Sequence, residues 1–243
     1  MKKIDVENLN RKKTYDWFKS FRDSTYGVNL NIDVTDLVKF SKETHTSFFI
    51  NFLFVLVKSL NSVDEMKMRF LNNEAVMYDV CNPGITVLTK NDTFENVRLC
   101  YVDDYKKFYK LAREKIDQAK NEEVLTKDSY NLTDAWNEYY ITSLPWISFT
   151  GVTHPIPDDV HSQVVPRICF GKYFLDKDKY FVPFNITVSH IFVDGYHISK
   201  LINVINVLVG SNCLFNELLT SFSPSRNLPL EGHASGRLSP FLQ

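Results

Sequence analysis

The chain has 243 residues, a length that suits one domain, and its composition of 44% apolar and 14% aromatic residues is typical of a globular protein. It carries 28 basic and 29 acidic side chains without a long basic run, which argues against a nucleic-acid interface. The first residues lack the apolar core of a secretory signal, and the apolar run 48–57 is too short to cross a bilayer. We therefore expect a cytoplasmic protein that binds neither nucleic acid nor a membrane.

Hydrophobic periodicity predicts an alternation of helices and strands along the chain. The expected helices cover residues 10–21, 37–42, 47–62, 105–118 and 196–208. The expected strands cover residues 26–34, 84–88, 139–144, 147–150, 164–174 and 180–188, with a hairpin formed by 68–71 and 75–78 around Asn72 and Asn73. Residues 155–162, rich in Pro and Asp, are expected to form a loop.

The last part of the chain differs from the rest in composition. Residues 221–243 hold three of the nine prolines and show no hydrophobic period. We therefore predict one domain over residues 1–220, followed by a disordered or appended tail over residues 221–243.

The cysteine pattern bears on metal binding. Cys81, Cys100, Cys169 and Cys213 are far apart and form no Cys-x-x-Cys pair. Structural zinc sites use closely spaced ligands, so we expect no metal site and four reduced thiols.

The segment most informative about chemistry is His190-x-x-x-Asp194-Gly195, which lies between an expected strand and an expected helix. A histidine at a strand end can project into a cleft, and its pKa near neutrality lets the neutral ring accept a proton. Gly195 permits a tight turn, and Asp194 lies where the helix dipole favours a carboxylate. The pattern is typical of a general base, although a capped helix behind an exposed histidine has the same signature.

Two further segments contain groups that could assist such a base. Thr142 and Ser143 precede Pro145-Trp146 at the end of an expected strand. A hydroxyl there can stabilise an oxyanion, or it can simply hydrogen-bond within a sheet. The segment from Gly171 to Tyr173 places a lysine and an aromatic ring beside a glycine. That combination suits a phosphate and an adenine ring, and it is also common on protein surfaces.

In this order, these segments resemble the chloramphenicol acetyltransferase family. The resemblance extends from about residue 5 to about residue 218 and rests on five motifs. They are Leu9-Asn10-Arg11-Lys12 with the aromatics that follow, Ser24-Thr25-Tyr26, Thr142-Ser143-Leu144-Pro145-Trp146, Phe170-Gly171-Lys172-Tyr173, and the eight residues from His190 to His197.

The resemblance implies a fold, an assembly and a reaction. The fold is an α/β two-layer sandwich of the CoA-dependent acyltransferase type, a mixed sheet with helices on one side. The assembly is a homotrimer with active sites between subunits. The reaction is direct transfer of an acetyl group from acetyl-CoA to a hydroxyl of chloramphenicol. Acetyl-CoA is a cosubstrate, and no permanently bound cofactor is expected.

The resemblance also implies roles for single residues. His190 would be the general base, and Asp194 would pair with Arg11 to hold the histidine loop. Thr142 would stabilise the oxyanion, with Ser143 as the alternative donor. The residues that would bind CoA are Lys172 and Tyr173. The residues that would form the acceptor pocket are Phe18, Tyr26, Phe94, Cys169 and Arg167.

Several pocket positions depart from the family's pattern, among them Cys169, Arg167 and His154. Acetyl transfer is therefore better supported than chloramphenicol as the acceptor. The alternatives are an acetyltransferase of this fold with another hydroxyl acceptor, a dihydrolipoamide acyltransferase core, and a non-catalytic binding protein. The lipoamide enzyme would be expected to carry a lipoyl domain and a Pro/Ala-rich linker, and the sequence contains neither.

Overall fold

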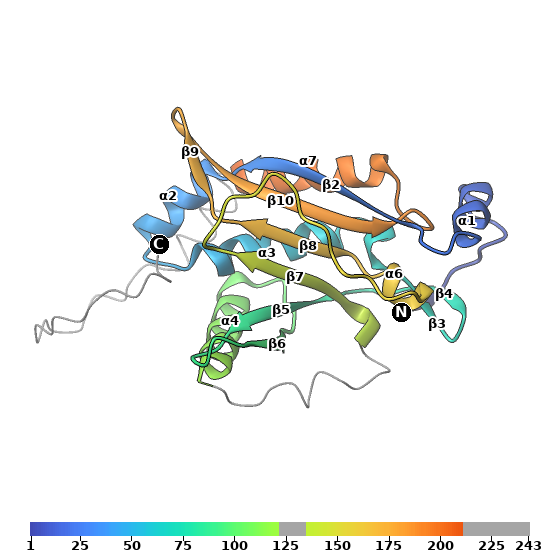
Figure 1. Cartoon of the computed structure of the whole chain (residues 1–243), viewed down its shortest axis with the longest axis horizontal. Coiled ribbons are helices and arrows are strands. Elements are labelled where there is room, and N and C mark those ends of the chain that lie inside the picture. Colours follow the sequence, from blue (N-terminus) through green and yellow to red (C-terminus); the bar gives the residue numbers. More distant parts are fainter. Residues whose placement is uncertain (122–134, 211–243) are drawn as a thin grey trace, which may run out of the picture.

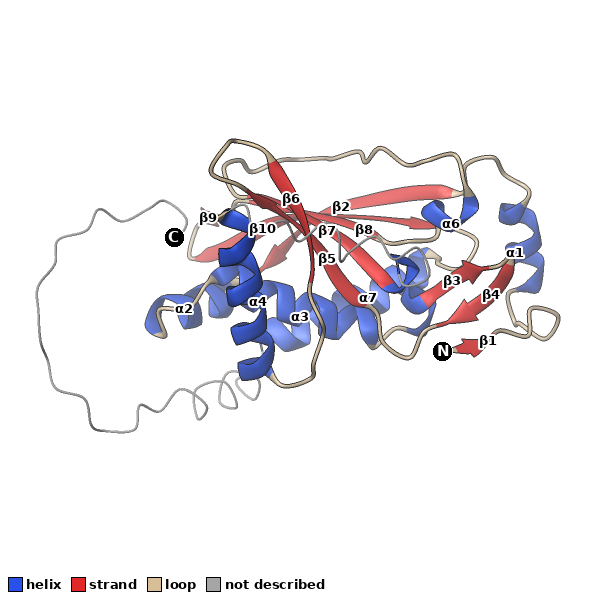
Figure 2. Ribbon diagram, turned by 90° about the horizontal axis from the view of Figure 1, so that it is seen from below, coloured by secondary structure: helices blue, strands red, loops and turns tan. Residues whose placement is uncertain are grey.

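A computed structural model of the chain describes residues 1–121 and 135–210. A mixed sheet forms one layer, and helices cover one of its faces (Figures 1 and 2). The strand order is β2 (Thr25–Asp33), β10 (Lys179–Ser189), β8 (Arg167–Gly171), β7 (Glu138–Leu144), β5 (Asn82–Leu88) and β6 (Phe94–Arg98), with β9 (Phe174–Asp176) paired to β10. Strands β8, β7 and β5 run parallel, and the other pairs are antiparallel. The expected α/β sandwich with a mixed sheet is confirmed.

The helices fall into two groups. The helices that cover the sheet are α2 (Thr35–Glu43), α3 (Phe48–Asn61), α4 (Tyr105–Lys120) and α7 (Gly195–Gly210) (Figure 2). The elements at one end of the molecule are α1 (Lys12–Lys19), α6 (Val160–Gln163), the 3-10 helices η1 (Asp64–Lys67) and η2 (Ala135–Asn137), and a small sheet of β1 (Lys2–Lys3), β4 (Glu74–Met77) and β3 (Met68–Leu71). The predicted tail, residues 221–243, and Cys213 lie outside the described residues.

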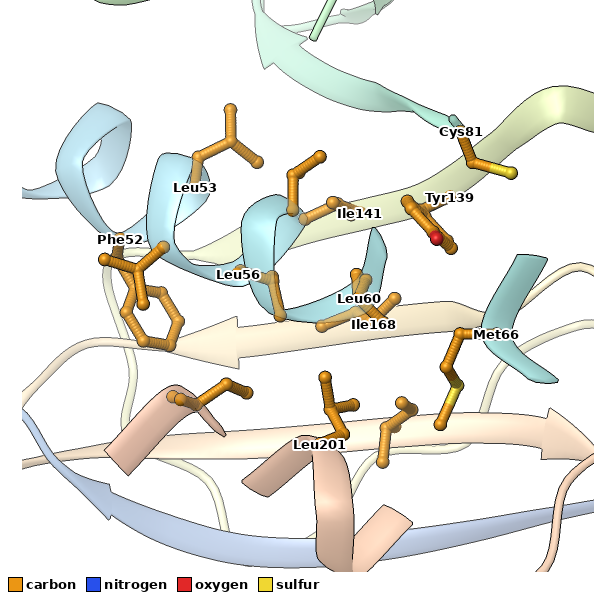
Figure 3. Packing of buried hydrophobic residues seen from close by; sticks show 14 of the residues in the cluster. Phe52, Leu53, Leu56, Leu60, Met66, Cys81, Tyr139, Ile141, Ile168 and Leu201 are labelled. Atoms are coloured by element: carbon orange, nitrogen blue, oxygen red, sulfur yellow. The ribbon is translucent and has the colours of Figure 1, made fainter. Parts of the chain in front are cut away.

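The hydrophobic core lies between the sheet and α3. Ser47 begins this helix by accepting a hydrogen bond from the Ile50 N–H. Leu56 and Leu60 are fully buried in the same cluster as Ile168 of β8 (Figure 3). Burying one such leucine stabilises the fold by roughly 1.5–3 kcal/mol, so α3 fixes the sheet in position.

The central strands present two different faces because successive side chains alternate. In β10, Phe184 and Ile186 belong to the core, so Asn185 between them points to the other face. The register places Asn185 opposite Cys169, and Cys169 opposite Thr142. These three side chains define what we call the open face, the face of the sheet away from the covering helices. The term means that no helix layer covers this face, and Asn185 and Cys169 themselves are buried.

Residues 147–159, the crossing segment, run over the open face from β7 to α6 (Figure 1). The Val152 N–H donates to Asn29 Oδ1 at 3.2 Å, and the Asn185 amide donates to the Val152 carbonyl at 3.2 Å. A Cβ at Gly171 would lie 2.8 Å from the Ile147 carbonyl oxygen. The crossing segment therefore needs a glycine at the end of β8 to approach the sheet.

The structure corrects two predicted strands. Residues 147–150 form no strand because they belong to the crossing segment, which follows a turn closed by the Ile147 N–H and the Leu144 carbonyl. The predicted strand 164–174 is divided into β8 and β9, and β6 lies outside every predicted strand. The predicted hairpin is confirmed, with Asn72 and Asn73 at φ of 51° and 62°, a conformation that asparagine tolerates.

Within residues 1–121 and 135–210, no helix is long and apolar enough to cross a membrane. The same residues contain no cluster of three or more His, Cys, Asp or Glu side chains that could hold a metal ion. Cys81, Cys100 and Cys169 are free thiols.

Candidate active site

His190 follows the last residue of β10 and is held by aromatic contacts. Its backbone N–H donates to the Ser24 carbonyl at 2.8 Å. The imidazole stacks on Phe18 with ring centroids 4.1 Å apart and on Tyr26 with centroids 4.3 Å apart. Two rings cannot stack on one face at these distances, so Phe18 and Tyr26 lie on opposite faces. The imidazole is therefore fixed in orientation while 31% of the side chain remains exposed.

An ion pair fastens the loop that follows His190. Arg11 donates to both carboxylate oxygens of Asp194, at 2.8 and 2.9 Å, and to the His190 carbonyl at 2.9 Å. Nδ1 of His190 lies 3.2 Å from Asp194 Oδ1. A carboxylate at this distance favours a proton on Nδ1, which leaves the Nε2 lone pair free to act as a base. Asp194 is also the residue immediately before α7, where a carboxylate is favoured.

Tyr26 contributes a neutral hydroxyl beside this loop. Burial, reinforced by the Asp194 charge, raises the pKa of Tyr26 to about 12. Its hydroxyl is therefore protonated near neutral pH and donates to the Val193 carbonyl at 3.4 Å.

Thr142 lies far from His190 of the same chain. Thr142 is level with Asn185 in the sheet, and His190 follows Asn185 by five residues. At about 3.3 Å per residue, this separates them by roughly 16 Å along the strands. The arrowheads of β7 and β10 point to opposite ends of the sheet (Figure 1). Ser143 points to the covered face, opposite to Thr142, because side chains alternate.

The remaining open-face candidates lie on β8, with Cys169 opposite Thr142 and Arg167 opposite Tyr140. Cys169 is buried, and burial raises the pKa of its thiol to about 11, so it is protonated near neutral pH. Arg167 donates from Nη1 to the carbonyls of Ser162 and Val165, at 2.7 and 3.1 Å, and its guanidinium lies over the Tyr140 ring. The buried cation is thus balanced by carbonyl dipoles and an aromatic ring.

His154, on the crossing segment, also belongs to this surface. Its Nε2 lies 2.9 Å from Asn185 Oδ1. Burial lowers the pKa of His154, so the neutral ring is favoured.

The predicted CoA residues and Phe94 lie at the end of the sheet opposite to His190. Lys172 is exposed, and its backbone N–H donates to the Ile147 carbonyl at 2.8 Å. Tyr173 packs edge-on against Phe48 and Tyr180. Phe94 begins β6 and is 64% exposed. The chain therefore brings Phe18, Tyr26, Arg11 and Asp194 to His190. Thr142 and Cys169 are paired elsewhere in the sheet, and Arg167 lies two residues before Cys169, opposite Tyr140.

Sequence reasoning missed the polar contacts that support His190 from behind. Ser189 Oγ lies 2.6 Å from Ser24 Oγ, and the Ser24 hydroxyl also lies 3.2 Å from Gln163 Oε1. No local pattern joins these residues. The contact of His197 with the Asp194 backbone was missed as well, although its spacing is that of a helix cap.

Chloramphenicol acetyltransferases are among the known proteins with similar sequences. A family model described as chloramphenicol acetyltransferase matches residues 1–206. The chloramphenicol acetyltransferase of Clostridium butyricum is 29% identical over 210 residues, which cover 86% of this chain and 94% of the relative. That of Proteus mirabilis is 26% identical over 211 residues, which cover 86% of this chain and 95% of the relative.

Solved structures agree in fold. A chloramphenicol acetyltransferase superposes with a TM-score of 0.78 at 22% identity, covering 86% of this chain and 99% of the other. A dihydrolipoamide acetyltransferase of Azotobacter vinelandii superposes with a TM-score of 0.63 at 13% identity, covering 89% and 93%. Because the family model spans most of the chain, the protein belongs to the chloramphenicol acetyltransferase family and is an acyltransferase.

Proposed function

We propose that the protein transfers the acetyl group of acetyl-CoA to a hydroxyl of chloramphenicol, the acceptor for which its relatives are named. The environment of His190 carries this proposal. The ring is held between Phe18 and Tyr26, and Nδ1 faces Asp194 at 3.2 Å. An imidazole fixed in this orientation, with a free Nε2 lone pair, is suited to removing a proton from a hydroxyl group.

Both substrates are bound together in the proposed mechanism, and no acyl-enzyme forms. Nε2 of His190 takes the proton from the acceptor hydroxyl while the hydroxyl oxygen attacks the thioester carbonyl carbon. The tetrahedral intermediate expels the CoA thiolate, which receives the proton from the imidazolium. The products are an ester and free CoA, and much of the rate enhancement comes from holding the two reactants in register.

The Thr142 hydroxyl is our candidate for stabilising the oxyanion. It lies roughly 16 Å along the strands from its own His190, too far to act there. We infer a homotrimer in which the open face of one subunit meets His190 of the next. Phe94, Trp146 and Ile147 are each more than half exposed near one end of the sheet. Such apolar side chains favour a contact surface at this end.

Mixing two variants with impaired turnover tests the shared site. His190→Ala and Thr142→Val are each expected to turn over slowly as pure proteins. If they are refolded together at equal amounts, about a quarter of the sites in random trimers combine an intact His190 with an intact Thr142. Recovery of about that fraction of activity supports the proposal, whereas no recovery contradicts a site between chains.

We assign CoA binding to Lys172 and Tyr173. Lys172 is exposed beyond the end of β8, so its ammonium group is available to a phosphate. Thr142 is paired with Cys169 in the sheet, and Cys169 lies three residues before Lys172 in the sequence. A pantetheine arm could therefore run along this end of the open face from the phosphate to the reacting thioester.

A hydroxyl acceptor other than chloramphenicol is the competing candidate. Arg167 and His154 place polar groups on the open face, and they favour a hydroxyl acceptor more polar than chloramphenicol. Thiol release from acetyl-CoA should be measured with chloramphenicol and with a panel of other alcohols, for wild type and His190→Ala. Turnover with other alcohols only would refute chloramphenicol as the acceptor. Absence of His190-dependent turnover with every acceptor would refute the proposed catalytic activity and favour a binding protein.

The likeness to dihydrolipoamide acetyltransferases is one of fold alone. Dihydrolipoamide should be included in the same assay as a thiol acceptor. Its acetylation in preference to every alcohol would favour that alternative over an O-acetyltransferase.

A further inference from the structure

The backbone of Asp194 is held by a group outside the ion pair with Arg11. Asp194 immediately precedes α7 and its carbonyl accepts from the Ile198 N–H at 3.2 Å, which makes it the N-cap residue. Its carboxylate contacts Arg11 and His190. Its own backbone N–H donates to Nδ1 of His197, three residues further on, at 2.9 Å. The His197 side chain is only 11% exposed, so water competes little for this bond.

This contact is one half of a capping box. In a capping box, the side chain three residues into the helix accepts from the N-cap N–H, and the N-cap side chain accepts in return. Glu or Gln usually supplies the first bond, and here the His197 ring does so. The return bond is absent among the described residues, because the His197 N–H donates to the Asp194 carbonyl oxygen. The Asp194 carboxylate is thereby left to Arg11 and His190.

The capping bond requires one form of the His197 ring. Nδ1 must carry a lone pair, so the proton of the neutral ring lies on Nε2. Nε2 faces Glu65 Oε1 of η1 at 3.4 Å, which favours this tautomer. Burial lowers the pKa of His197 and favours the neutral ring, although Glu65 and Asp194 oppose this effect. Arg11 and Lys200 are the cations that act with burial.

We propose that His197 and Glu65 are positioning residues for the reaction, because they fix the backbone of Asp194 and thereby the orientation of His190. Neither residue needs to touch a substrate. Arg11 holds the carboxylate of Asp194, and His197 holds its main chain. Two tethers on one residue restrict the loop more than the ion pair alone. This inference rests on the proposed role of His190 as the base.

The kinetic test compares three variants with wild type. His197→Ala removes the capping bond and should lower kcat by about 10- to 100-fold, the scale of a misplaced catalytic group, with KM for acetyl-CoA unchanged. His197→Gln restores the usual capping-box acceptor and should recover most of kcat. The matched control is Ile205→Val, a buried change further along α7 that should lower Tm by about 2–4 °C without affecting kcat.

A spectroscopic test does not depend on turnover. Nitrogen-15 NMR of labelled histidines should show His197 protonated on Nε2 and His190 protonated on Nδ1 at pH 7.5. In Glu65→Ala, which removes a partly exposed side chain, His197 should populate the other tautomer. In His197→Ala, His190 should lose its preference for Nδ1–H.

The outcomes separate this inference from the proposed function. Protonation of His197 on Nδ1 in wild type would overturn the inference, and so would an unchanged His190 spectrum in His197→Ala. Unchanged kcat in His197→Ala would do the same. Absence of turnover in wild type would count only against the proposed acceptor or activity, and the NMR result would then decide on the positioning pair alone.

Discussion

Replacing Asp194 by asparagine tests the loop that carries His190. The carboxylate accepts two bonds from Arg11 and lies 3.2 Å from Nδ1 of His190. An amide retains the shape and removes the charge, so Arg11 loses one of the two acceptors that this side chain offers and keeps its bond to the His190 carbonyl. The amide also removes the charge that favours the proton on Nδ1 of His190.

The size of the effect follows from the burial of the pair. Breaking a fully buried ion pair costs about 3–5 kcal/mol. Arg11 is 13% exposed but the Asp194 side chain is 36% exposed, so solvent screens the pair, and we expect a loss of about 2 kcal/mol. The kinetic loss should be larger. In a serine protease, the equivalent change leaves the wrong tautomer and lowers kcat by about 10⁴-fold, and we expect about 10²- to 10⁴-fold here.

Urea unfolding and acetyl-CoA thiol release together measure both effects of Asp194→Asn. Asp158→Asn is the control, because Asp158 pairs with Arg22 on the surface and both side chains are more than half exposed. That variant should change stability by less than about 1 kcal/mol and leave kcat unchanged. Normal stability together with normal kcat in Asp194→Asn would refute the assigned role. Lost stability with normal kcat would show that the pair serves folding only.

Three further predictions concern the open face and the sheet. Thr142→Val should lower kcat with little change in KM, because an oxyanion contact acts mainly in the transition state. An unchanged kcat in steady-state kinetics would exclude Thr142 as the group that stabilises the oxyanion. Lys172→Ala should raise KM for acetyl-CoA and leave kcat intact, and an unchanged KM would remove Lys172 from the CoA site. Burial raises the pKa of Glu138 to about 7 despite Arg98, so stability should fall as pH rises from about 4.5 to about 7. Between pH 5 and pH 8, the free energy of unfolding of Glu138→Gln should fall by about 2 kcal/mol less than that of wild type. If the urea midpoints of both proteins changed with pH in the same way, this prediction would be contradicted.

Local patterns predicted the elements whose side chains follow a clear period. Alternation along residues 26–34 indicated β2, and the apolar stretches 180–188 and 47–62 indicated β10 and α3. The division of the predicted strand 164–174 was not predicted, because apolar residues lie on both sides of Gly171 and Lys172 and are typical of one continuous strand. The break depends on Gly171 and on the approach of Ile147, a contact between distant parts of the chain.

The candidate site was predictable in its chemistry and less so in its geometry. The motif was predicted to place His190 at a strand end and Asp194 near the start of the next helix, and in the structure Nδ1 of His190 lies 3.2 Å from Asp194 Oδ1. Arg11 lies 183 positions before Asp194, and its pairing came from resemblance alone. The aromatic contacts of Phe18 and Tyr26 with His190 join three separate elements, and no periodicity in the sequence predicts them.

The strand directions have a consequence for how activity depends on assembly. Strands β7 and β10 run in opposite directions, because β7 is parallel to β8 and β8 is antiparallel to β10. A group near the end of β7, such as Thr142, therefore cannot meet His190 beyond the end of β10 in the same chain. If Thr142 assists His190, a monomer is inactive although it contains every motif. Specific activity should then fall on dilution in step with the loss of trimer seen by sedimentation. A constant specific activity through dissociation would mean that the oxyanion is stabilised by a group within the same chain.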